Sequence, residues 1–110
     1  KKKPDYDKGR AIVLVNSFTV SQAECIAEII RKAPDGIVVG EKTAGTLGQA
    51  TYIPYLNGVW TCYTNYSVYE LNGRNTYPNG VKIDYLVNPK KLDFDRCDDY
   101  ILDEALKITK

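Results

Sequence analysis

The chain has 110 residues, the size of one small domain or of a segment of a larger one. Its 15 Lys and Arg residues nearly balance its 14 Asp and Glu residues, so a net charge of +1 gives it no long-range field for gathering nucleic acid. It contains no histidine, which excludes a Ser-His or Cys-His catalytic pair, or a histidine-ligated metal site, made by this chain alone.

The first part of the chain predicts a strand–helix–strand unit. After a polar lead-in over residues 1–10, the unbroken apolar run 11–15 is typical of a strand buried on both faces of a sheet. A helix is predicted over residues 21–33, because small and aliphatic side chains recur there every three or four positions, and a Pro-Asp-Gly sequence ends it. A second short strand is predicted over 37–39, so residues 11–40 form a right-handed βαβ unit.

From residue 41 to residue 87 the pattern changes to a loop followed by a β-rich extension. Seven of the nine tyrosines and three Asn-Gly dipeptides fall in this stretch. The clearest hairpin joins residues 52–56 to 59–69, and residues 81–87 predict a last strand. An amphipathic helix is predicted over residues 95–110.

The three cysteines, Cys25, Cys62 and Cys97, are far apart and form no C-x-x-C motif. Three thiols cannot all pair within one chain, so we expect packed small apolar side chains. No cofactor and no metal site is predicted.

The connection from the first strand to the helix offers a candidate nucleophile, Ser21. A hydroxyl at a helix N-terminus lies beside free backbone N–H groups, which can hold a developing oxyanion. The same sequence, Ser21-Gln22-Ala23-Glu24, is also a capping box, and the pattern alone favours the cap.

Two other segments are candidate sites. Residues 39–45 place a glycine-containing loop at the end of a strand, where open α/β sheets bind ligands, although the spacing is not that of a phosphate loop. Residues 78–84 predict a turn and a strand. The tyrosine-rich strands are typical of half-buried sheet packing, with a stacking surface for peptide, sugar or base as the alternative.

Taken in order, these segments resemble the C-terminal processing, or tail-specific, serine peptidases. The similarity extends from Gly9 to the last helix, and four segments carry it: 11–16, 19–24, 39–45 and 80–84. In that family the nucleophilic serine lies three residues before a glutamate, which is Ser21 here. The resemblance implies that the N–H of Ser21 or of Gln22 supplies an oxyanion donor, and that Gly45 and Thr46 support the site.

The sequence departs from the bacterial tail-specific branch at the general base. That branch has a lysine directly after Thr-x-Gly and a glutamine four residues later, whereas this chain has Thr46 and Ala50. It also has Ile83 where the family has proline. The Thr-Ala-Gly form is more similar to the tricorn-like and retinoid-binding-protein-like branch, in which a histidine from earlier in the chain is the base.

The resemblance therefore implies the C-terminal part of a catalytic domain, with the α/β class and a crotonase-like or ClpP-like α/β sandwich built on a mixed sheet. The base and the second oxyanion donor would come from upstream sequence, so the isolated chain is expected to be inactive. One alternative is a catalytically degenerate relative that binds peptide or another ligand. Another is an unrelated α/β domain in which Ser21 is only a cap.

The resemblance also implies partners and a location. Substrates would be extended peptides or unfolded proteins bound beside a strand. An open sheet edge would favour a homo-oligomer or pairing with the upstream part of the catalytic domain. Family analogy places the protein outside the cytoplasm, in the periplasm, the cell envelope or the medium.

Overall fold

The structure, a computed structural model, describes residues 9–70, 73–88 and 99–109. Its elements are, in order, β1 (Ile12–Val15), α1 (Gln22–Arg31), β2 (Ile37–Gly40), β3 (Gly48–Pro54), a 3-10 turn (Leu56–Gly58), β4 (Trp60–Ser67), β5 (Tyr85–Leu86) and α2 (Tyr100–Ile108). Within these ranges, no helix has the length and apolar character needed to cross a membrane. The fold is mixed α/β, with one parallel and one antiparallel sheet.

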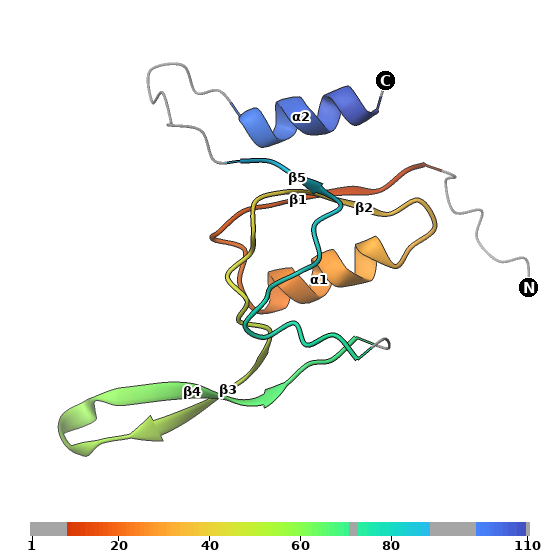
Figure 1. The fold of residues 1–110 in the computed structure, drawn as a ribbon. Helices are drawn as coiled ribbons and strands as arrows, with labels where there is room; N and C mark the ends of the chain where they lie inside the picture. Colours follow the sequence, from red (N-terminus) through yellow and green to blue (C-terminus); the bar gives the residue numbers. More distant parts are fainter. Residues whose placement is uncertain (1–8, 71–72, 89–98, 110) are drawn as a thin grey trace, which may run out of the picture.

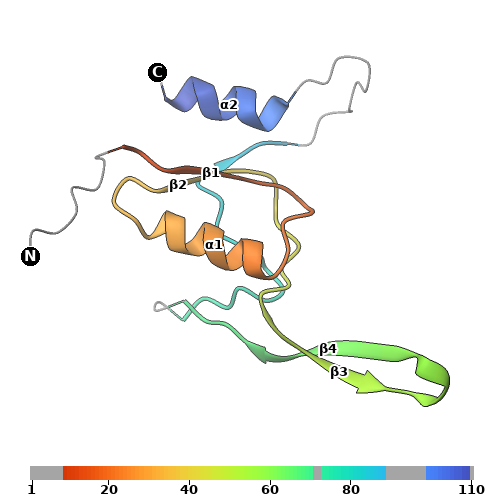
Figure 2. The same cartoon turned by 180° about the vertical axis from the view of Figure 1, so that it is seen from behind.

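The parallel sheet has the order β1-β2-β5, and a helix covers each of its faces (Figures 1 and 2). Val38 and Val39 are both fully buried, because successive side chains of β2 point to opposite faces. Val38 packs with Ala27 of α1, and Val39 packs with Ile101 of α2. The predicted βαβ unit is therefore confirmed, and β2 is the central strand that both helices cover.

The first strand differs from the prediction of burial on both faces. Leu14 is 38% exposed, and Val15 is the buried residue of β1. Within the described ranges β1 pairs only with β2, so one side of the strand is an open edge.

Helix α1 buries a different face from the one that its apolar residues predict. Ile26 is 50% exposed, whereas Glu24, Ala27 and Glu28 are buried. The helix turns two glutamates inward, where Glu24 accepts hydrogen bonds and Glu28 forms ion pairs with Arg31 and Arg74 at 3.8 Å. An apolar pattern does not predict such positions.

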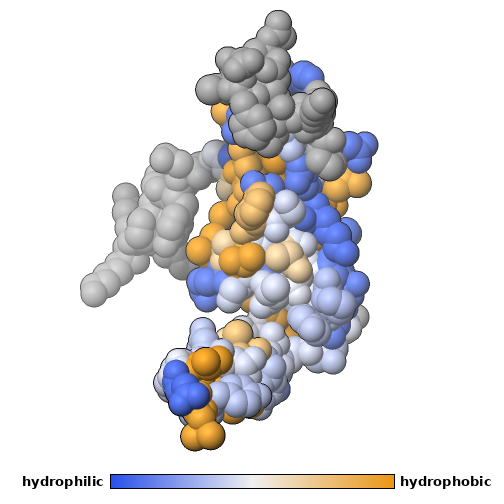
Figure 3. Space-filling model, turned by 90° about the vertical axis from the view of Figure 1, so that its left-hand side faces the viewer, coloured by the Kyte–Doolittle hydropathy of each residue, from blue (hydrophilic) through white to orange (hydrophobic). Residues whose placement is uncertain are grey.

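The antiparallel pair β3–β4 is a hairpin that projects away from the rest of the chain (Figure 1). The predicted Asn-Gly turn is present, with positive φ at Asn57 (70°) and Gly58 (73°). Most hairpin side chains are exposed, and the space-filling view shows apolar surface there (Figure 3). Cys62 is exposed on β4 and Cys25 is half-buried, so burial as a small apolar side chain is wrong for Cys62; Cys97 lies outside the described residues.

The last two predicted elements are shorter in the structure. Of the strand predicted over 81–87, only Tyr85–Leu86 pairs with β2, although Val81 and Val87 are buried. Helix α2 begins after Asp99, whose carboxylate accepts a hydrogen bond from the Leu102 N–H at 3.0 Å. Residues 1–8, 95–98 and 110 of the predicted lead-in and closing helix lie outside the described residues.

A cluster of charged side chains ties α1 to the segments that precede β5. Arg74 donates to Glu70 at 2.5 Å, and Arg31 bonds to Asp84 at 3.4 Å. Asp84 in turn accepts from the Val38 N–H at 3.0 Å, which fixes its segment to the centre of the sheet. The hydrogen bond from Arg74, followed by the positive charge of that side chain and of Arg31, lowers the pKa of Glu70 despite its burial.

We expect Val38→Ala to lower the free energy of unfolding by about 2 kcal/mol, because it removes two methyl groups from a fully buried site. Denaturant unfolding measures the change. Val59→Ala is the matched control, since Val59 is 60% exposed at the hairpin and should change stability by less than about 0.5 kcal/mol. Equal effects of the two substitutions would contradict the placement of Val38 in the core.

The ionised form of Glu70 is favoured in the folded chain, so its contribution to stability is present above the ordinary glutamate pKa and is lost as pH falls through the lowered value. Glu70→Gln should therefore flatten the dependence of the unfolding free energy on pH below about 4.5. Denaturant unfolding between pH 6 and pH 3 gives this slope. Glu104→Gln, in an ion pair whose Lys107 is largely exposed, is the control and should change stability little.

Candidate active site

One buried carboxylate, that of Glu24, joins the helix start to the loop that follows β2. Its Oε1 accepts from the Thr43 hydroxyl at 2.6 Å and the Gly45 N–H at 2.8 Å. Its Oε2 accepts from the Ser21 N–H at 3.1 Å, the Thr46 N–H at 2.8 Å and the Thr46 hydroxyl at 3.2 Å. These donors compensate for the removal of a carboxylate from water.

Residues 78–84, the last of the three candidate segments, pack against the loop that follows β2. The Thr43 hydroxyl, while donating to Glu24, accepts from the Val81 N–H at 3.0 Å. A Cβ on Gly80 would lie 2.4 Å from the Thr43 oxygen, and one on Gly45 would lie 2.2 Å from the Pro78 carbonyl oxygen. Both glycines also have positive φ. The close approach of these loops therefore requires glycine at both positions, and all three segments meet around Glu24.

Ser21 stands at the turn from β1 into α1 and is exposed. Its φ of 48° and ψ of −111° are unlike the extended conformation of an ordinary N-cap residue. The Ala23 N–H donates to the Val20 carbonyl at 3.0 Å and closes the turn around it. The bond from the Ser21 N–H to Glu24 is the glutamate half of the predicted capping box. A positive φ costs a serine conformational energy, and such strain is concentrated at functional sites.

The two candidate oxyanion donors of this turn differ in whether the N–H already has a hydrogen-bond partner. The Ser21 N–H points to Glu24 and to the Thr46 hydroxyl, at 3.1 and 3.0 Å. Within the described ranges, the Gln22 N–H has no hydrogen-bond partner, as expected for the first N–H groups of a helix. Gln22 therefore has the N–H that is open to an incoming group.

The structure brings the four predicted site residues together, since Ser21 and Gln22 lie at the start of α1 and Gly45 and Thr46 lie in the loop that Glu24 binds. Thr43 and Val81 also belong to this arrangement. Both lie in segments that carry the family resemblance, but the hydrogen bond between them was not predicted, because a sequence motif does not show which loops meet.

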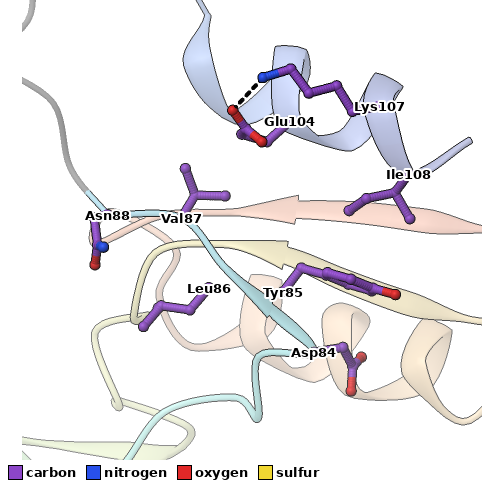
Figure 4. A pocket seen from close by; sticks show the side chains of 8 residues that line it. All are labelled: Asp84, Tyr85, Leu86, Val87, Asn88, Glu104, Lys107 and Ile108. Atoms are coloured by element: carbon purple, nitrogen blue, oxygen red, sulfur yellow. Dashed lines mark hydrogen bonds and ion pairs between the residues drawn. The ribbon is translucent and has the colours of Figure 1, made fainter.

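Two of the cavities in the described residues lie beside α2 and beside the connection from β1 to α1. A cavity of about 550 Å³ is lined by β5 and α2 residues, among them Tyr85, Leu86 and Ile108 (Figure 4). A smaller one, of about 140 Å³, includes Asn16 and Thr19 of the connection that leads to Ser21. Among the residues that the structure describes, no cluster of three or more Cys, Asp and Glu side chains could hold a metal ion.

The chain matches a family model and is similar to solved structures. Residues 1–87 match the family model described as Peptidase family S41. No curated protein matches the chain. A crystal structure at 2.26 Å resolution of a "putative peptidase" from Parabacteroides merdae aligns with a TM-score of 0.74 and 24% sequence identity. The alignment covers 90% of this chain and 31% of that one, so the chain spans about a third of the length of this relative and shares its fold.

The family match includes the β1–α1 turn, the loop bound by Glu24 and the segment around Gly80. It excludes the reading of the chain as an unrelated α/β domain, and it confirms the resemblance to the C-terminal processing peptidases. Because the match extends over residues 1–87 of 110, the chain belongs to peptidase family S41.

Proposed function

We propose that this chain is the part of a serine endopeptidase core that carries the nucleophile, Ser21. The observation that supports this role most directly is the backbone of Ser21, an exposed residue with φ of 48° at a strand-to-helix turn. A strained turn of this kind presents a serine hydroxyl above a sheet, next to the N–H groups of the following helix.

In the proposed reaction, the Ser21 hydroxyl oxygen attacks the carbonyl carbon of a peptide bond, and a base takes the hydroxyl proton. The carbonyl oxygen becomes an oxyanion, to which the open Gln22 N–H donates, at the positive end of the α1 dipole. Collapse of this intermediate breaks the C–N bond, and the base returns its proton to the leaving amine. Water then hydrolyses the ester on Ser21 in the same two steps.

The base and the second oxyanion donor are proposed to come from outside this chain. The sequence has no histidine, and in the described ranges no lysine forms a hydrogen bond with Ser21. Thr46 occupies the position of the lysine in the tail-specific branch, and a threonine hydroxyl is not a base near neutral pH. We therefore place the chain nearer the tricorn-like branch and expect little activity from the isolated segment.

A second candidate function is a catalytically degenerate family member that binds peptides without cutting them. The observation that favours it is the contact between the Thr46 hydroxyl and the Ser21 N–H, at 3.0 Å, where the tail-specific branch has its base. In this reading Ser21 serves only to start α1.

Partners and location follow as proposals from the fold and the family. The free edges of β1 and β5 in the described sheet could each take a further strand, from an extended peptide, a second copy or the upstream part of the domain. Action outside the cytoplasm is proposed by family analogy alone. We propose no nucleic-acid partner, since the chain is nearly neutral.

We expect Ser21→Ala, in the full-length protein, to reduce kcat/KM for casein cleavage by about 10³-fold or more, because it removes the group proposed to form the acyl-enzyme. Mass spectrometry of the products measures cleavage. Ser17→Ala is the matched control, an exposed serine in the same connection, and should cut as the native protein does.

Cleavage by the Ser21→Ala protein at the native rate would remove Ser21 from the reaction. A native protein that stays folded and binds extended peptides, but neither cuts them nor reacts with a fluorophosphonate, would instead support the degenerate module.

A further inference from the structure

We propose that Thr46 is a positioning residue that holds Ser21 in its strained conformation through a side-chain hydrogen bond. This inference rests on the proposed role of Ser21 and adds a residue that acts on it without touching substrate. It assigns to Thr46 a function of its own at a position where the tail-specific branch carries a catalytic lysine.

The conformation of Ser21 needs support from its surroundings. A non-glycine residue at positive φ is held there only when neighbouring contacts determine it. The turn bond from Ala23 to Val20 supplies one such contact. The Cys25 N–H donates to the Ser21 carbonyl at 3.1 Å. Two more contacts act on the Ser21 N–H, which donates to Glu24 at 3.1 Å and to Thr46 at 3.0 Å.

The donors and acceptors at Thr46 are arranged for this task. Its hydroxyl has one proton, which is directed at Glu24 Oε2 at 3.2 Å, so its lone pairs are left to accept from Ser21. The backbone N–H of Thr46 donates to the same carboxylate oxygen at 2.8 Å and fixes the residue from which the hydroxyl projects. Ser21, Glu24 and Thr46 therefore form a closed set in which each member restrains the other two.

Among the described residues, Thr46 is the hydrogen-bond partner of Ser21 that lies in a distant part of the chain. Of the hydrogen bonds that Ser21 forms in the described ranges, the one that its N–H donates to the Thr46 hydroxyl joins residues 25 positions apart. Thr46 itself is exposed, so its hydroxyl is not needed to fill the core. Its presence at the helix start is better explained by what it does to Ser21 than by packing.

Valine at position 46 keeps the shape of the side chain and removes the hydroxyl, whereas serine keeps the hydroxyl. In the full-length protein we expect Thr46→Val to lower kcat for casein cleavage, and the rate of Ser21 labelling by a fluorophosphonate, about tenfold, with KM little changed. Thr46→Ser should restore both rates to within about twofold. Thr61→Val, at an exposed threonine of β4, is the matched control and should behave as the native protein.

Hydrogen exchange of the Ser21 amide gives a readout that does not depend on activity. Loss of the Thr46 acceptor should accelerate exchange at this amide several-fold, and Thr46→Ser should restore its protection. Thr46→Ala is measured in parallel, in case the valine variant does not fold. Native rates of both labelling and exchange in the valine or alanine variant would overturn the proposal, as would a serine variant as impaired as the valine variant.

The failure of the proposed function is distinguishable from the failure of this inference. If the native protein neither cuts nor reacts at Ser21, the nucleophile assignment fails, and amide exchange alone decides whether Thr46 holds the turn. If Ser21→Ala abolishes cleavage while Thr46→Val leaves every rate unchanged, the nucleophile stands and the positioning role is refuted.

Discussion

The arrangement of this chain depends on one buried carboxylate. Glu24 is fully buried, and five hydrogen bonds reach its two oxygens. A carboxylate in this position is costly unless every donor stays in place, so the loop from Thr43 to Thr46 and the turn at Ser21 must adopt their conformations together. The geometry of the candidate site is therefore a consequence of satisfying a charge inside the protein.

This constraint also changes how the helix start is understood. A capping box and a nucleophile are usually treated as alternative explanations for a serine in this position. Here the glutamate that completes the box also binds the loop containing Gly45, and it holds Ser21 at positive φ. Both explanations involve the same contacts, so the capping box is compatible with the proposed nucleophile.

The sequence predicted those parts of the fold that depend on local pattern. The βαβ unit, the Asn57-Gly58 turn and the family were correct, because apolar runs, turn residues and motif order are local signals. The buried face of α1 was wrong at Ile26, since its direction is set by partners of Glu24 that lie far along the chain. Thr43 was missed as a link between loops for the same reason, and the short pairing of β5 could not be read from its apolar residues. The crotonase-like or ClpP-like sandwich and the branch of the family stay predictions.

The backbone of Ser21 has an evolutionary consequence. Glycine would adopt a φ of 48° with a ψ of −111° at lower cost, and Ser21 enters the Glu24 set through its N–H, which glycine also possesses. A lineage that no longer used the hydroxyl could therefore gain stability by drifting away from serine at this position. Ser21 is therefore the less stable choice for this turn, and the proposed nucleophile would account for a hydroxyl at this position.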